Sequence, residues 1–250
     1  MTNRLQGRRI LITGAAAGIG RACANACLAE GSAVALIDRD QDRLKAAALD
    51  LERTGQVYSL ALDISDQGAA AAGVDELVRA LGGLDGVVNS AGIDLHQPFA
   101  ATAWQDWAQV MAINLNGPMH VCHAALDALK SSGHGAIVNI ASGAGLRPIP
   151  DRVAYCVSKA ALIMATKALA LDLAPHGIRA NVVCPGAVDT ELFRHSLGSV
   201  RTIDDVKALY AMKRIGKASE IAAAVVFLVS EEASFVTGAA LAVDGGRVFH

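Results

Sequence analysis

Residues Thr13 to Gly20 read TGAAAGIG and stand between a short apolar run and the start of a helical pattern. Glycine lets backbone N–H groups approach a ligand closely, and the first turn of a helix carries the positive end of its dipole. A strand, a glycine-rich turn and a helix in this order therefore favour the binding of a pyrophosphate. The spacing Gly-x-x-x-Gly-x-Gly differs from the Gly-x-Gly-x-x-Gly fingerprint, so a turn without a ligand is still an alternative at this point.

The alternation of apolar runs with helical patterns continues along the chain of 250 residues. Continuous apolar runs predict strands buried on both faces, and strands alternating with helices give an α/β fold with helices on both faces of a parallel sheet. No linker, repeat or charge block interrupts it, so we expect a single domain over residues 1–250. The predicted strands are Arg9–Thr13, Ala33–Asp38, Val57–Leu62, Gly86–Asn89, Ala136–Ile140, Arg179–Cys184 and Ala240–Val243, and the predicted helices cover 18–30, 40–54, 66–80, 104–130, 152–174 and 219–230.

The segment from Ala187 to Met212 breaks this alternation. It follows a strand directly, has mixed polarity, and delays the next clear helix until Ser219. Insertions at the carboxyl edge of a parallel sheet line the ligand crevice. We expect a substrate lid at about 187–212, with a plain surface excursion as the alternative.

Charge and hydropathy argue against two classes of partner. A formal net charge of −2 leaves no basic surplus for phosphates, so we expect no nucleic acid. The mean hydropathy is +0.37, yet no run approaches about 18 uncharged apolar residues, and the longest, Ile221 to Val229, ends at Glu231. We therefore expect no membrane span and a cytoplasmic protein.

Cysteine and histidine spacing predicts neither a disulfide framework nor a metal site. The five cysteines form no Cys-x-x-Cys pair, and their odd number does not fit a closed set of disulfides. We expect buried thiols in a reducing compartment. His120 and His123 can share a helical face, but no nearby carboxylate or thiol spacing clearly supplies further ligands, so we predict no metal.

The second predicted strand ends at Asp38, eighteen residues beyond Gly20. A carboxylate at this place accepts hydrogen bonds from both ribose hydroxyls of NAD and repels the 2′-phosphate of NADP. Ala17 within the turn is not basic, so it provides no positive charge to bind that phosphate. Arg39 indicates the opposite, because an arginine directly after the strand can bind a phosphate. We expect NAD, with NADP as the alternative.

Tyr155 and Lys159 are four residues apart in a helical pattern, so both side chains project from one face. Such pairs also occur by chance on solvated helices. Here the flanking residues from Ala154 to Ala165 leave little polar face, and a helix that is apolar on all sides is buried.

A lysine beside a tyrosine can convert the phenol into a base. Bringing a phenol from its usual pKa to about 7 needs about 4 kcal/mol. An ammonium about 5 Å away contributes roughly 3 kcal/mol at an effective dielectric of about 20. The positive nicotinamide ring of an oxidised cofactor can supply the rest, so we expect the pair to be a sufficient device for a phenolate near neutral pH.

Six ordered motifs resemble those of the short-chain dehydrogenase/reductase family over essentially the whole chain. Residues 13–20 match Thr-Gly-x-x-x-Gly-x-Gly, and NSAG at 89–92 is similar to Asn-Asn-Ala-Gly, with Ser90 in place of the second asparagine. Asn114 stands in an Asn-x-x-Gly stretch, and Ser142 precedes Tyr155 by thirteen residues. PGAVDT at 185–190 and DGG at 244–246 complete the resemblance.

The resemblance implies a single domain with a Rossmann-like, doubly wound parallel sheet of seven strands, and it implies catalytic roles. Ser142 stabilises the charge that develops on the substrate oxygen, and Tyr155 transfers the proton. Lys159 lowers the tyrosine pKa and binds the nicotinamide ribose. Asn114 would hold a water that connects Lys159 with solvent, and the hydride chemistry belongs to the cofactor.

The same motifs imply a set of cofactor-binding residues. Asp63 resembles the residue that contacts the adenine, with a turn cap as the alternative, and Thr190 would hold the nicotinamide amide, with a helix cap as the alternative. The full set is Gly14, Ala17, Gly18, Ile19, Gly20, Asp38, Arg39, Asp63, Ile64, Asn89, Ala91, Gly92, Tyr155, Lys159, Pro185, Gly186, Val188 and Thr190.

The residues expected to line the substrate site give conflicting cues. Asp94 and Arg147 favour a polar substrate, whereas Ile149 and Phe193 favour an apolar one. The sequence therefore leaves the substrate open. The candidates are Asp94, His96, Ser142, Gly143, Arg147, Ile149, Tyr155, Phe193 and His195.

The expected function is an NAD(H)-dependent interconversion of a secondary alcohol, polyol, sugar or hydroxysteroid with its ketone. One alternative is a 3-oxoacyl-[acyl-carrier-protein] reductase that uses NADPH. The other is a dinucleotide sensor without turnover, against which the complete set of four catalytic residues speaks. The family resemblance also implies a homotetramer, in which the apolar helix around Tyr155 covers the sheet on one face and a partner subunit on the other.

Overall fold

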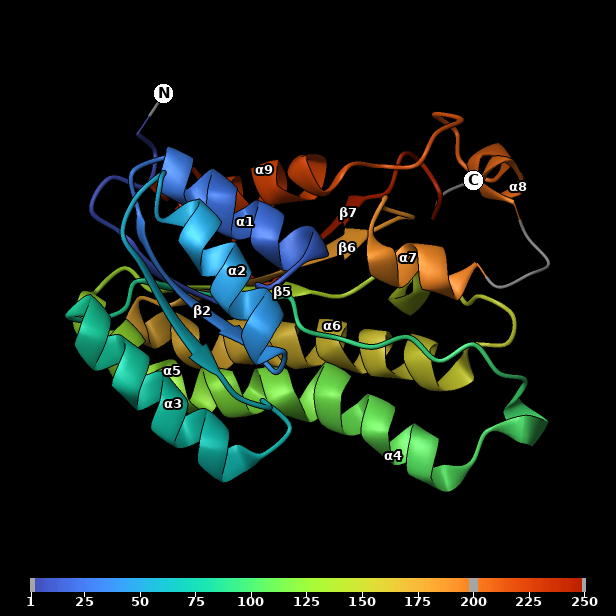
Figure 1. Ribbon diagram of the computed structural model, residues 1–250, viewed down its shortest axis with the longest axis horizontal. Coiled ribbons are helices and arrows are strands. Elements are labelled where there is room, and N and C mark those ends of the chain that lie inside the picture. Colours follow the sequence, from blue (N-terminus) through green and yellow to red (C-terminus); the bar gives the residue numbers. More distant parts are fainter. Residues whose placement is uncertain (1–2, 198–201, 249–250) are drawn as a thin grey trace.

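The apolar runs form a seven-stranded parallel sheet in the computed structural model, which describes residues 3–197 and 202–248 (Figure 1). The strand order is β3-β2-β1-β4-β5-β6-β7, and the edge strands β3 and β7 are partly exposed. The strands are β1 (Arg9–Thr13), β2 (Ala33–Asp38), β3 (Val57–Ala61), β4 (Gly86–Asn89), β5 (Ala136–Ile140), β6 (Arg179–Pro185) and β7 (Ala240–Val243). The predicted fold class, a doubly wound parallel sheet, is confirmed.

Helices cover both faces of this sheet. Figure 1 shows α1 and α9 on one side and α3, α5 and α6 on the other. The helices are α1 (Gly18–Ala29), α2 (Gln41–Leu51), α3 (Gln67–Leu81), α4 (Trp104–Met111), α5 (Gly117–Ser132), α6 (Val153–Leu173), α7 (Glu191–Ser196), α8 (Ile203–Ala208) and α9 (Ala218–Val229).

The helix predicted over 104–130 is not regular. A π-helical turn, Ala112–Asn116, separates α4 from α5, and the N–H of Gly117 bonds to the carbonyl of Ala112, five residues earlier. Hydrophobic periodicity cannot reveal such a turn, because the apolar pattern is offset by only one residue. The turn contains Asn114, one of the four predicted catalytic residues.

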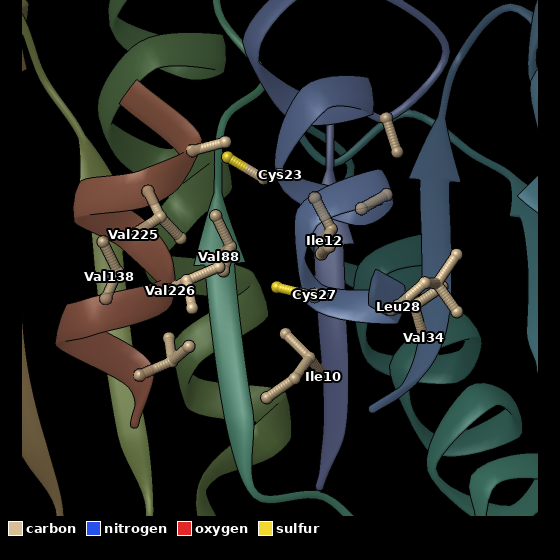
Figure 2. Close-up of a cluster of buried hydrophobic side chains, with 14 of the residues drawn as sticks. Ile10, Ile12, Cys23, Cys27, Leu28, Val34, Val88, Val138, Val225 and Val226 are labelled. Atoms are coloured by element: carbon tan, nitrogen blue, oxygen red, sulfur yellow. The ribbon is translucent and has the colours of Figure 1, made fainter. Parts of the chain in front are cut away.

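The core between the sheet and α1 and α9 uses two cysteines as small apolar side chains. Figure 2 shows Cys23 and Cys27 of α1 beside Ile10, Ile12 and Val88 of the sheet. Burial raises the pKa of the Cys27 thiol to about 12, so it stays protonated. All five cysteines are free, and only Cys156 is partly exposed.

Among the described residues, one helical stretch, Val153–His176, is long and apolar enough to cross a membrane. Its residues Leu162 and Ile163 are buried against Val182 and Cys184 of β6. The stretch therefore has the packing of a core helix that covers the sheet.

The segment predicted as a lid, 187–212, contains the two short helices α7 and α8, and its residues 198–201 lie outside the described part of the chain. It follows the carboxyl end of β6. The sheet order reverses between β1 and β4, which are neighbours although two strands separate them in sequence. In such sheets the ligand crevice opens at the carboxyl ends of the strands on either side of this point.

Candidate active site

A cavity of about 790 Å³ lies at the carboxyl ends of the strands. Its nucleotide half is lined by residues that follow β1, β2 and β3. Its substrate half is lined by residues around Ser142 and Tyr155, by α7, and by the later segments 206–210 and 247–248. Of the residues predicted at the site, only Asn89 and Asn114 do not line this cavity; both are fully buried behind it.

The glycine turn brings the backbone close to the segment after β4. Gly14 has a φ of +66°, and a Cβ atom there would lie 2.7 Å from the Cα of Ala91. The helix that follows, α1, begins at Gly18 with no side-chain cap and no acidic residue in its first turn. Its first N–H groups therefore face the cavity without a side-chain acceptor, and the arrangement fits a bound pyrophosphate.

The carboxylate of Asp38 is fixed at the end of β2. Its Oδ2 accepts a hydrogen bond from the N–H of Ala16 (3.1 Å), and its Oδ1 accepts one from the N–H of Asp40 (3.1 Å). Arg39 and Arg43 line the same part of the cavity. This part of the cavity therefore carries one acid at the strand end and two nearby cations.

Asp63 caps a turn and Thr190 caps a helix, which were the alternative roles predicted for them. Both residues also line the cavity. Asp63 Oδ1 accepts hydrogen bonds from the N–H and hydroxyl of Ser65, and these bonds lower the pKa of the carboxyl. Thr190 Oγ1 accepts the N–H of Phe193 and so caps α7. Capping leaves both residues at the cavity wall, so the two readings are compatible.

Tyr155, Lys159 and Ser142 meet at one end of the cavity. The Lys159 ammonium lies 5.8 Å from the centroid of the Tyr155 ring and donates a 2.9 Å hydrogen bond to the carbonyl of Ile140. Ser142 Oγ accepts the N–H of Ala144 (3.0 Å), and the Ser142 side chain lowers the pKa of the phenol. The one-turn spacing on α6 therefore places the tyrosine and the lysine side by side, as predicted.

The lysine alone does not make Tyr155 a base. Burial raises the pKa of Tyr155 to about 12, which outweighs the hydrogen bond from Ser142. The same burial lowers the pKa of Lys159 to about 8. The sequence argument counted the charges of the lysine and of the oxidised cofactor but not the desolvation of the phenolate, which is the largest cause of the raised pKa.

The side chain of Asn114 holds the segment after β4 against α6. Its Oδ1 accepts the N–H of Ile93 (2.8 Å), and its Nδ2 donates to the carbonyl of Ile93 and to the Ser158 hydroxyl. A Cβ atom on Gly92 would lie 3.2 Å from Asn114 Oδ1 and 3.3 Å from Lys159 Nζ. Glycine at this place therefore leaves space between the amide and the ammonium.

The substrate half mixes apolar and charged side chains. Asp94, Ile149 and Phe193 line it, as do the more exposed His96, Arg147 and His195. Arg152 forms a buried ion pair with Asp94. Sequence reasoning missed Arg152, although its position one turn before Tyr155 was a signal for it. It also missed the cavity-lining residues Ser90, Pro150, Leu192, Ser196, Leu209, Tyr210, Arg247 and Val248.

Within residues 3–197 and 202–248 there is no group of three or more His, Cys, Asp or Glu side chains that could hold a metal ion. His120, one of the two histidines considered above, has its Nδ1 3.0 Å from the carbonyl oxygen of Ile64.

Comparison with known proteins agrees with this arrangement. Residues 14–247 match the family model described as enoyl-(acyl carrier protein) reductase. The chain is 41% identical to 2-(S)-hydroxypropyl-CoM dehydrogenase 3 of Xanthobacter autotrophicus, over 98% of both chains. It is 37% identical to D-threitol dehydrogenase of Mycolicibacterium smegmatis, over 97% of this chain and 94% of the relative.

A solved structure of an oxidoreductase is also similar to this chain. The crystal structure of an NAD+-bound xylitol dehydrogenase superposes with a TM-score of 0.93 at 32% identity, covering 97% of this chain and 99% of the other. The fold and the relatives together define an oxidoreductase that interconverts alcohols and carbonyls. More narrowly, the chain belongs to the short-chain dehydrogenase/reductase family.

Proposed function

We propose that the protein is an NAD(H)-dependent dehydrogenase that oxidises a secondary alcohol or polyol to its ketone, and catalyses the reverse reduction, with Tyr155 as acid and base. One observation supports this above all others. Ser142, Tyr155 and Lys159 line one end of a cavity whose other end is lined by the glycine turn and Asp38. Such a cavity brings an alcohol and a dinucleotide together in one orientation.

Proton transfer follows from the side chains at the substrate end. When bound, the nicotinamide ring accepts or returns the hydride. Ser142 donates a hydrogen bond to the substrate oxygen, and Tyr155 exchanges the proton with that oxygen. Because the pKa of Tyr155 is about 12, the phenol is the proton donor for ketone reduction at neutral pH. Alcohol oxidation needs the positive charge of Lys159 and of the oxidised cofactor beside it.

Lys159 and Asn114 connect the phenol with solvent in this proposal. The pKa of Lys159, about 8, lies close to neutral, so the ammonium can release a proton and regain it. We place a water in the space that Gly92 leaves between Lys159 and Asn114. Asn114 would hold this water while its amide bonds to Ile93 keep the segment after β4 in place.

Asp38 supports NAD as the cofactor, because its fixed carboxylate would repel a 2′-phosphate. The names of the relatives support a secondary hydroxyl on a small, partly polar molecule as the group oxidised. Arg39 and Arg43 favour the alternative, a 3-oxoacyl-[acyl-carrier-protein] reductase-like enzyme that uses NADPH. A dinucleotide sensor is the second alternative, and it leaves the cavity-lining Ser142, Tyr155 and Lys159 without a role.

We also propose a cytoplasmic homotetramer. Five free cysteines support a reducing compartment. On α4 and α6, Trp104, Met164 and Leu171 are 74%, 64% and 79% exposed, which supports a partner subunit on this surface. Light scattering at micromolar protein concentration checks the assembly, and a monomer would contradict it.

The central experiment replaces the phenol. Tyr155→Phe should abolish the NAD-linked oxidation of every active alcohol in a panel of secondary alcohols and polyols, followed by the absorbance of NADH. NADH binding, followed by its fluorescence, should be unchanged. Tyr58→Phe on strand β3 is the matched control and should keep full activity. Substantial turnover by Tyr155→Phe would mean that another group carries the proton.

A further inference from the structure

A buried ion pair beside Tyr155 has no part in the mechanism above. Arg152 stands directly before α6, three residues before Tyr155, and its Nη1 bonds to Oδ2 of Asp94 in the segment after β4. The two side chains are only 16% and 9% exposed. Arg152 Nη2 also donates a 2.8 Å hydrogen bond to the carbonyl of Ser196, the last residue of α7. One guanidinium therefore joins three separate segments around the substrate half.

Stability does not account for this pair. Taking two charges out of water costs about as much as their attraction returns, and apolar residues of similar volume often replace a buried pair without loss. Arg152 Nε and Asp94 Oδ1 are moreover buried without a hydrogen-bond partner, which is unfavourable. A pair kept at this cost, in the wall of the cavity, indicates a role in the reaction.

The two charges act on Tyr155 in opposite directions. Asp94 raises the pKa of the phenol, and Arg152 lowers it. The pKa of Asp94 is itself raised by burial, against the effect of Arg152. The other titratable or charged groups that act on Tyr155 or Lys159, or that line the cavity around them, are Cys156 on α6, Cys184 on β6, His96 after β4, Arg147 after β5, Glu191 and His195 on α7, and Tyr210 and Arg247 in the later segments.

We propose that Arg152 is a positioning residue: it fixes the end of α7 over the substrate half and compensates the charge of Asp94 beside the phenol. This inference rests on the proposed role of Tyr155. Without Arg152, α7 loses its bond to the start of α6, and Asp94 stands unpaired next to Tyr155. Without the charge of Asp94, the bond from Arg152 to Ser196 remains.

The decisive experiment compares Arg152→Met, Asp94→Asn and the double variant in the full-length protein. The readout is the pH profile of kcat/KM for NAD-linked oxidation of the best alcohol among D-threitol, xylitol and cyclopentanol. The acid limb of the profile should move up by about one pH unit in Arg152→Met and down in Asp94→Asn. In the double variant it should return close to wild type.

Two further readouts separate positioning from charge. The alcohol KM should rise about tenfold in both variants that carry Arg152→Met, but not in Asp94→Asn. Hydrogen exchange of the α7 amides, which needs no substrate, should speed up in the same two variants. Arg152→Lys, whose ammonium cannot hold both partners, should restore the acid limb without restoring slow exchange in α7.

Arg79 and Asp75 form an exposed ion pair on α3 and provide the matched control. Arg79→Met and Asp75→Asn should change none of these readouts. Shifts of the acid limb in the same direction, or unchanged α7 exchange in Arg152→Met, would overturn the proposal. Failure of the proposed function is a separate result, because Tyr155→Phe would then retain turnover whatever the Arg152 variants do.

Discussion

The two halves of the cavity are built in different ways. In the nucleotide half, the turn at Gly14 and the uncapped start of α1 present backbone to a ligand, and Asp38 adds a carboxylate at the end of β2. In the substrate half, side chains from distant segments meet, such as Asp94 and Arg152. Backbone walls suit a ligand common to many enzymes, whereas side-chain walls can be exchanged one at a time to change the substrate. Four changes test this division.

Lys159→Met should have the largest effect, since Lys159 lies where the halves meet. Turnover should fall about 1,000-fold, the scale of acid–base catalysis. Stability should rise at neutral pH. The folded pKa of about 8 lies below the unfolded value, so the buried ammonium costs stability below pH 8, and this cost disappears as the pH rises through the unfolded pKa. Removing it should gain about 2 to 3 kcal/mol at pH 7.

Thermal unfolding measured at pH 7 and at pH 10 checks this sign for Lys159→Met. The variant should be more stable than wild type at pH 7, and the difference should shrink at pH 10. Lys45→Met, an exposed position on α2, is the control and should change neither quantity. A destabilised Lys159→Met at pH 7 would contradict the desolvation argument.

Gly14→Ala should damage the nucleotide half alone. A Cβ atom there collides with the backbone of Ala91 at a positive φ, and such strain costs about 1 to 3 kcal/mol, enough for a 10- to 100-fold loss of NADH affinity. Gly133→Ala is the control, because its φ of +73° is similar but no atom lies within 4 Å. If both variants bind NADH equally, the close approach of Gly14 to Ala91 does not contribute to NADH binding.

Asp38→Asn tests whether one side chain decides the choice of cofactor in the nucleotide half. The amide can still accept the N–H of Ala16 but carries no charge to repel a phosphate. The ratio of kcat/KM for NADP to that for NAD should rise about tenfold. Asp42→Asn in the first turn of α2 is the control. An unchanged ratio would indicate that Arg39 and Arg43, and not Asp38, discriminate between NAD and NADP.

The smallest effect is expected where an exposed ion pair spans the two halves. Arg43 on α2 pairs with Glu191 on α7, and both side chains are about half exposed. Exposed pairs are screened by solvent, so Arg43→Ala should change the KM for NAD less than about threefold at physiological salt. A larger change that disappears in high salt would mean that α7 is held by both halves.

The difference between local backbone features and side chains from distant segments also explains which parts of the site the sequence could predict. The strands, the glycine turn and the one-turn spacing of Tyr155 and Lys159 depend on local periodicity, and the structure has all of them. Tyr210 and Arg247 reach the cavity only through tertiary packing, so no spacing in the sequence marks them. The desolvation of Tyr155 could not be predicted for a related reason, because it depends on neighbours that local sequence does not identify.

The π-helical turn before α5 makes the chain sensitive to length at one point. Each residue advances a helix by about 100° around its axis, so the extra residue between Ala112 and Asn116 sets which way everything beyond it faces. A single-codon deletion there would leave an unbroken, regular helix and turn the amide of Asn114 relative to α5. At this point we expect the deletion of one residue to disturb the fold more than a substitution does.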